Sequence, residues 1–213
     1  MLPKLEAWEK IMSSLGINNN DDILIYDNSD LKSSCRLWFS LLYFGHDEKK
    51  IYILNGGLKK WIFENKPITK LTTEIIKSNY VTNEKENLVV SFDQIKKNIL
   101  SKSFNVIDAR SLERFEGKVS EPRKGLRSGH IQNSFCLPFN QCINQKTGEF
   151  KNLEELRELF NQNENIEKRL DQVFTCGSGV TAAVLAYAYK MVNNDYIPKI
   201  YDGSWSEYGK YPA

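Results

Sequence analysis

The sequence has few histidines and no closely spaced pair of cysteines, the residues that most often bind metals or form redox-active disulfides. It holds 2 His among 213 residues, and its 4 Cys form no Cys-x-x-Cys pair and no spacing typical of metal ligands. We therefore expect no metal site and four reduced thiols, as in a reducing compartment. These thiols stand at Cys35, Cys136, Cys142 and Cys176.

The sequence also lacks a long apolar run and a long block of like charge. Its formal net charge is +2, no window approaches the apolar length of a membrane span, and residues 1–6 do not resemble the apolar core of a signal peptide. We expect no nucleic-acid or membrane partner and a cytoplasmic location. The hydrophobic share of 41% is ordinary for a globular chain with room for one α/β domain and part of another.

One cysteine lies in a loop suited to holding an anion. Strand-forming residues 171–175 lead to Cys176, and the apolar run 182–189 predicts a buried helix. The loop's backbone N–H groups, with the helix N-terminus behind them, would stabilise negative charge at the sulfur. A buried structural cysteine is the alternative, and Thr181 also fits a helix N-cap. The loop consists of Gly177, Ser178, Gly179, Val180 and Thr181.

The loop resembles the active-site loop of the mercaptopyruvate sulfurtransferases, a branch of the rhodanese superfamily. Those enzymes move sulfur from 3-mercaptopyruvate to a thiol or cyanide. The branch that uses thiosulfate typically carries Arg-Lys where this chain has Gly177-Ser178, so the resemblance implies a donor whose carboxylate is bound outside the loop. It also implies the rhodanese fold, with Cys176 as the nucleophile and residues 177–181 as substrate-binding residues.

A second segment is similar to the same family over several motifs in order. In the family, the arginines that match Arg114 and Arg123 bind the substrate carboxylate, and a guanidinium offers such a group a two-pronged hydrogen bond. A solvated basic loop is the alternative interpretation. The motifs are Asp108-Ala109-Arg110, Arg114-Phe115-Glu116-Gly117, Glu121-Pro122-Arg123-Lys124-Gly125 and Gly129-His130-Ile131.

The chain contains an internal repeat whose first copy is incomplete. Residues 25–61 parallel residues 174–208 as strand, loop, buried helix, strand, Gly turn and helix, and Asp27 falls where Cys176 does. A carboxylate cannot carry a persulfide, so we expect the first copy to be catalytically silent, as in tandem sulfurtransferases. About sixty residues of the second copy have no counterpart in the first, so the histidine and aspartate that the family is proposed to use there cannot be carried over. We assign residues 1–66 to a partial domain, 67–87 to a linker and 88–213 to the catalytic domain.

The remaining pattern predicts an α/β fold of the rhodanese type. Alternating strands and helices favour a mostly parallel sheet with helices on both faces. Ligands of such sheets bind at the carboxyl ends of the strands, where Cys176 would lie. We expect helices at 92–100 and 153–160, the second capped by Asn152, and strands at 23–26, 51–54, 88–91, 104–107 and 134–137.

Two other functions compete with sulfur transfer. A phosphatase of the dual-specificity kind needs an arginine that closes its Cys loop, but Ala182 and Ala183 stand there. A non-catalytic interaction module would fit the partial first domain, although Cys176 and both arginines are retained. The two histidines fit structural roles, His46 at a helix end and His130 before an apolar strand.

We predict a sulfurtransferase that works through a cysteine persulfide and releases pyruvate from 3-mercaptopyruvate, with thiosulfate as the alternative donor. Arg114 and Arg123 would hold the donor, Cys176 would take the sulfur, and no cofactor is required. The acceptor would be thioredoxin, a small thiol or cyanide. We expect the incomplete first copy to pack on the complete C-terminal domain, on a second copy of the chain, or on a separately supplied N-terminal piece.

Overall fold

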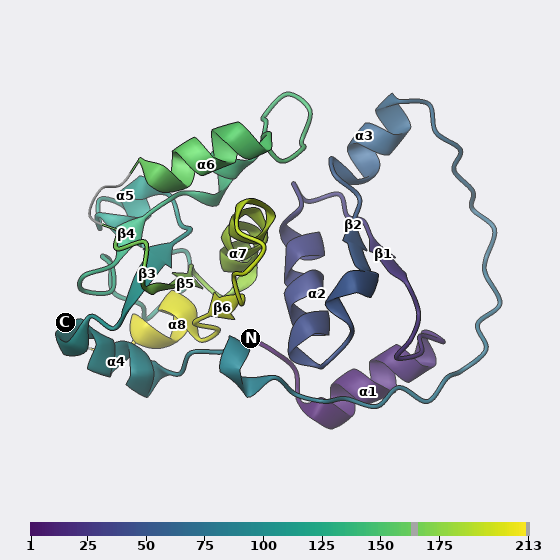
Figure 1. Cartoon of the computed structure of the whole chain (residues 1–213), viewed down its shortest axis with the longest axis horizontal. Coiled ribbons are helices and arrows are strands. Elements are labelled where there is room, and N and C mark those ends of the chain that lie inside the picture. The colour runs from purple at the N-terminus through teal and green to yellow at the C-terminus, as the bar shows by residue number, and fades with distance from the viewer. Residues whose placement is uncertain (163–165, 212–213) are drawn as a thin grey trace.

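The first half of the chain forms a small parallel sheet with helices beside it (Figure 1). The structure, a computed structural model, describes residues 1–162 and 166–211. Strand β1 pairs with β2 in parallel, with Ile23 opposite Ile51. The elements of this half are α1 (Leu5–Ser14), β1 (Ile23–Ile25), α2 (Lys32–Tyr43), β2 (Ile51–Ile53) and α3 (Gly57–Phe63), with a short 3-10 turn at Glu48–Lys50.

The second half forms a four-stranded parallel sheet in the order β4-β3-β5-β6. This arrangement confirms the predicted α/β fold class. The elements are α4 (Phe92–Ser101), β3 (Phe104–Asp108), α5 (Leu112–Phe115), β4 (Phe135–Cys136), α6 (Leu153–Asn161), β5 (Asp171–Thr175), α7 (Val180–Val192), β6 (Lys199–Ile200) and α8 (Ser204–Tyr208), with 3-10 turns at Glu86–Leu88 and Phe139–Cys142.

Local capping residues set where two of these helices begin. Ser91 and Gln94 form a reciprocal capping box at the start of α4, and Asn152 and Glu155 form another at the start of α6. The prediction that Asn152 caps this helix is therefore confirmed. The predicted strand 88–91 is largely wrong. Its first residue ends a 3-10 turn and its last residue caps α4, so only Val89 forms a bridge, to β6.

The two halves share one apolar core in which α2 packs beside α7 (Figure 1). The ring of Trp38 from α2 meets Tyr187 of α7 edge-on, with centroids 5.0 Å apart. Helix α7 carries the apolar run predicted to be buried, and residues 182–186 are fully buried. The core therefore fixes the first half against the helix that follows the cysteine loop.

One face of the first sheet remains exposed. Leu24 of β1 and Tyr26, which directly follows that strand, are each 59% exposed, whereas their counterparts in β5, Val173 and Thr175, are fully buried. Among the described residues β1 pairs only with β2, while β5 lies between β3 and β6. The first sheet is thus open on the edge and face that its counterpart covers.

Residues 66–85 contain no helix or strand and follow the outer side of the first half (Figure 1). The backbone N–H groups of Ser78 and Tyr80 donate to Ser13 in α1, at 3.1 and 3.0 Å. This segment includes most of the predicted linker, whose role as a domain boundary stays a prediction. No helix within the described ranges is long and apolar enough to cross a membrane.

Candidate active site

Cys176 follows β5 directly and lies at the start of the loop that leads into α7. Its side chain is buried, and its Sγ accepts a hydrogen bond from the Ser178 N–H at 3.4 Å. Gly179 has a φ of +78°, a left-handed conformation that favours glycine, and is the N-cap of α7. The N-cap interpretation of Thr181 is therefore wrong: the helix begins at Val180, so Thr181 lies in its first turn, half-buried beside the loop.

Helix α8 holds the carbonyl side of the loop. The N–H of Trp205 donates to the Cys176 carbonyl and the N–H of Ser206 to the Gly177 carbonyl, both at 2.9 Å. In a planar trans peptide the carbonyl and the N–H point in opposite directions. The N–H groups of Gly177 and Ser178 therefore point away from α8, and that of Ser178 reaches the sulfur.

Two arginines lie over this loop. A side chain built at Gly177 would approach Arg114 Nη2 at 3.2 Å and Arg123 Nη1 at 3.5 Å. The structure thus brings together the predicted nucleophile and both predicted carboxylate-binding residues. The loop contributes no cation of its own, but two guanidinium groups stand beside it, a suitable arrangement for an anionic donor.

A buried chain of alternating charges orients Arg114. Its guanidinium donates to Glu121 at 2.6 and 3.2 Å, and Glu121 also accepts from Arg110 at 2.8 Å. Arg110 in turn donates to Asp108 at 2.6 Å. Burial opposes the positive charge of Arg110. The hydrogen bonds and negative charges of Asp108 and Glu121 outweigh this effect and raise the pKa of Arg110.

This chain of charges leaves the second arginine free for a ligand. Arg123 is exposed and forms no hydrogen bond or ion pair with another residue in the described part of the chain. The sequence motifs contained Asp108, Arg110 and Glu121, but reasoning from the sequence gave them no role. Their signal was the alternation of acidic and basic residues from position 108 to position 123.

Asp27 occupies in the first half the place that Cys176 has in the second. The N–H of Leu58 donates to its carbonyl at 2.8 Å, as Trp205 does to Cys176. Its carboxylate accepts from the N–H of Ser29 at 3.3 Å and from that of Ser34 at 2.8 Å. Burial opposes ionisation, but these N–H groups and the Ser29 hydroxyl outweigh it and hold the pKa of Asp27 below its usual value. A loop of this geometry therefore stabilises an anion on its first residue.

The histidines have structural contacts. His46 is fully buried after the end of α2, and its ring nitrogens lie 3.2 Å from the Tyr80 hydroxyl and 2.9 Å from the Asp21 carbonyl. His130 stacks on Phe115 with ring centroids 4.0 Å apart, and its Nδ1 lies 2.9 Å from the Phe115 carbonyl oxygen. These contacts agree with the structural roles expected for both.

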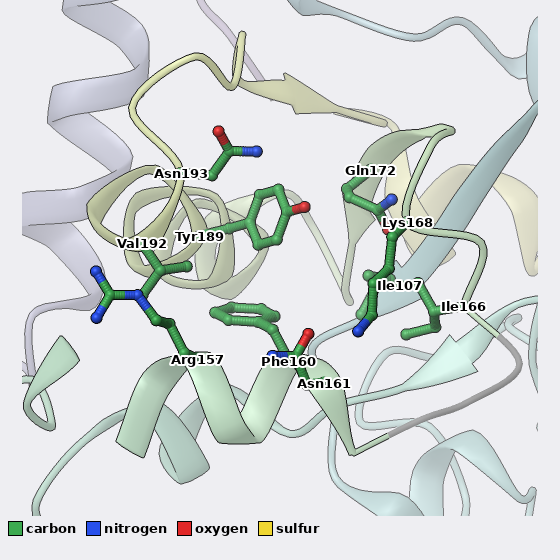
Figure 2. Close-up of a pocket in the computed structure, with 10 residues that line it drawn as sticks. All are labelled: Ile107, Arg157, Phe160, Asn161, Ile166, Lys168, Gln172, Tyr189, Val192 and Asn193. Atoms are coloured by element: carbon green, nitrogen blue, oxygen red, sulfur yellow. The ribbon is translucent and has the colours of Figure 1, made fainter. Parts of the chain in front are cut away.

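A cavity of about 330 Å³ lies apart from the cysteine loop, among α6, α7 and the start of β5 (Figure 2). Its lining includes the aromatic rings of Phe160 and Tyr189 and the cationic side chains of Arg157 and Lys168. It lies beside Gln172, in the first part of β5, whereas Cys176 follows the last residue of that strand. Neither Cys176 nor the two site arginines line this cavity.

The family profile described as Rhodanese-like domain matches residues 1–64 and 91–211. The chain belongs to this rhodanese family. It is 38% identical to the thiosulfate/3-mercaptopyruvate sulfurtransferase 2 of Arabidopsis thaliana, an alignment that covers all of this chain and 67% of that protein. It is 34% identical to the human 3-mercaptopyruvate sulfurtransferase, over 98% of this chain and 69% of that enzyme.

The rhodanese architecture also agrees with solved structures. The 3-mercaptopyruvate sulfurtransferase SseA of Escherichia coli superposes with a TM-score of 0.83 and 31% identity, over 97% of this chain and 75% of that one. This chain spans about two thirds of the length of the two relatives described above. The comparison confirms the resemblance that the cysteine loop and the arginine motifs suggested.

Proposed function

We propose that this chain moves sulfur from 3-mercaptopyruvate to a thiol or to cyanide through a persulfide on Cys176. The observation that carries the proposal is the position of Arg114 and Arg123 over the loop of a buried cysteine. The relatives named above are sulfurtransferases that use mercaptopyruvate or thiosulfate, which supports the same chemistry here.

The reaction follows from these groups. The two guanidinium groups bind the donor carboxylate, and the Cys176 thiolate attacks the donor sulfur. An S–S bond forms while the C–S bond breaks, and its electron pair leaves on carbon as the enolate of pyruvate. A proton then reaches that carbon and gives pyruvate. Loop N–H groups stabilise the persulfide.

The second half of the reaction returns the free enzyme. The acceptor thiolate or cyanide attacks the outer sulfur, a new bond to that sulfur forms, and the Cys176 thiolate leaves. A thioredoxin or a small thiol is the proposed biological acceptor. The residues assigned to these steps bind the donor carboxylate, carry the transferred sulfur and stabilise the persulfide, while the acceptor is a second molecule and the proton for the enolate comes from the solvent.

Comparing two donors tests the proposal. We expect pyruvate release from 3-mercaptopyruvate with cyanide as acceptor to be much faster than thiocyanate formation from thiosulfate. The reason is that Gly177 and Ser178 add no positive charge to the loop, while a dianion favours paired cations. A clear preference for thiosulfate would assign the chain to the alternative function, and no transfer from either donor would contradict both.

We also propose a tandem organisation in which residues 1–66 are a silent partial domain, 67–87 a linker and 88–213 the catalytic domain. The matching hydrogen bonds at Asp27 and Cys176 support it. The open face of β1 supports a partner that covers it, either a separately supplied N-terminal piece or a second copy. A cytoplasmic location stays part of this proposal, and cell fractionation tests it.

A further inference from the structure

Arg36, a residue of α2 in the first half, reaches the cysteine loop of the second half. Its Nη1 lies 2.7 Å from Oδ1 of Asp202 and 3.1 Å from the carbonyl oxygen of Gly179. The Arg36 side chain is 14% exposed and that of Asp202 10%. An ion pair so shielded from water holds its geometry more firmly than a surface pair.

The surroundings of Gly179 are close-packed. A side chain built at Gly179 would come within 2.8 Å of Asp202 Oδ1 and 2.9 Å of Arg36 Nη1. The other carboxylate oxygen of Asp202 accepts the N–H of Leu2 at 2.7 Å. The Asp202 carboxylate, in the turn before α8, therefore contacts both α2 and the start of the chain beside Gly179.

This contact fixes the direction of one loop N–H. The Gly179 carbonyl faces Arg36, and the peptide that joins Gly179 to Val180 is planar and trans. The Val180 N–H therefore points away from Arg36. Val180 is the first residue of α7, where unpaired N–H groups and the helix dipole favour a negative charge.

We propose that Arg36 is a positioning residue for sulfur transfer: by holding the Gly179 carbonyl, it directs the Val180 N–H to the sulfur carried by Cys176. The inference rests on the function proposed above and deepens it. It also assigns a task to the silent half, which has no nucleophile but supplies the residue that shapes the loop. Arg36 does not contact the donor in this proposal, so its effect is on kcat rather than on KM.

Four variants test the role of Arg36. Arg36→Met removes the guanidinium group that donates a hydrogen bond to the Gly179 carbonyl, and Arg36→Lys keeps the positive charge. The double variant Arg36→Met/Asp202→Asn also neutralises the carboxylate that Arg36→Met leaves unpaired. Lys32→Met, on the same helix but in a surface pair with Asp30 at 3.8 Å, is the control. We expect Arg36→Met to lower kcat for 3-mercaptopyruvate about tenfold or more, because it misdirects a backbone N–H that stabilises negative charge during the reaction. KM should change little, Arg36→Lys should recover part of the rate, and the double variant should fold but stay slow.

An alkylation assay separates this inference from the proposed function. The rate at which iodoacetamide labels Cys176, followed by peptide mapping, needs no turnover and should fall in Arg36→Met but not in Lys32→Met. If the wild type transfers sulfur and the folded double variant keeps its full kcat, the inference is wrong. If the wild type transfers no sulfur, the proposed function fails, and equal alkylation rates in wild type and double variant would then overturn the role of Arg36 as well.

Discussion

Burial holds the thiols of Cys35, Cys136 and Cys142 protonated at neutral pH. It raises the pKa of Cys142 to about 12, and with the added effect of Asp108 it raises the pKa of Cys136 to about 12. Burial also raises the pKa of Cys35 well above its usual value. A protonated thiol is a poor nucleophile, so these three do not compete with the loop cysteine.

The first prediction concerns these thiols. Replacing Cys176 by Ser should abolish sulfur transfer, because a hydroxyl without a base cannot take the sulfur. Cys136→Ser and Cys142→Ser should retain most of the rate. Steady-state pyruvate release on the three variants checks this, and loss of activity in a well-folded Cys142→Ser protein would assign that thiol a catalytic part.

The second prediction concerns the two arginines over the loop. Arg114→Ala and Arg123→Ala should each raise KM for 3-mercaptopyruvate, since each charge-assisted hydrogen bond contributes about 1.5 to 3 kcal/mol. Lysine at either place should recover only part, because an ammonium group does not form the two-pronged bond. Arg157→Ala, an exposed arginine of α6 beside the separate cavity, is the matched control and should leave KM unchanged.

Unchanged KM in both alanine variants would move the carboxylate site elsewhere. Glu121→Gln adds a sharper test, because Glu121 orients Arg114 and contacts no donor in this account. It should raise KM less than Arg114→Ala does. An equal or larger rise would mean that the network, rather than the guanidinium over the loop, dominates binding.

At the scale of elements, the loop before α2 repeats the anion-holding geometry of the loop before α7. The pKa of Asp27 is held below its usual value of 3.8 in the folded chain, because the N–H groups and hydroxyl that it accepts from outweigh the effect of burial. Its ionised carboxylate therefore stabilises the fold fully above the unfolded pKa, and this contribution is lost as the pH falls through the lower, folded pKa.

The third prediction follows from this sign. Asp27→Asn should lower the free energy of unfolding by about 1 kcal/mol at neutral pH, the difference between a charged and a neutral hydrogen-bond acceptor. The difference should shrink as the pH falls below 3.8. Denaturant unfolding across this pH range checks it, with exposed Asp22→Asn as control. A pH-independent difference would mean that the carboxylate is not the stabilising form.

Local signals in the sequence predicted most of the elements but not the contacts between distant ones. The Asn152 cap, the strand before Cys176 and the buried helix after it depend on neighbouring residues, so their patterns are readable. The contact of Arg36 with Gly179 joins positions 143 apart and has no local signature. The role of Glu121 was missed for a related reason, because only the folded chain places it between two arginines.

At the scale of the whole molecule, the first half of the chain packs against the second half but leaves one face of its own sheet open. Helices α2 and α7 join the two halves, yet Leu24, Tyr26 and Tyr52 share one exposed face of the first sheet. In the other sheet the corresponding face packs against Ile95 of α4 and Trp205 of α8. Such an open apolar face next to an unpaired strand edge favours association.

The fourth prediction is that the purified chain self-associates through this face unless a partner covers it. Leu24→Lys/Tyr26→Lys should reduce both light scattering and the binding of 8-anilinonaphthalene sulfonate, because charged side chains on an open sheet block pairing. Leu100→Lys, at an exposed apolar position of α4, is the control. A monodisperse wild-type monomer with no dye binding and full activity would contradict the prediction.

Sulfur transfer through Cys176 is tested most directly by a single turnover without acceptor. The chain is mixed with 3-mercaptopyruvate, and its intact mass, its cysteine peptides and the pyruvate formed are measured together. We expect one added sulfur atom per chain, located on Cys176, and an equal amount of pyruvate, both lost in Cys176→Ser. Pyruvate formed without sulfur on Cys176, or sulfur found on another cysteine, would contradict it.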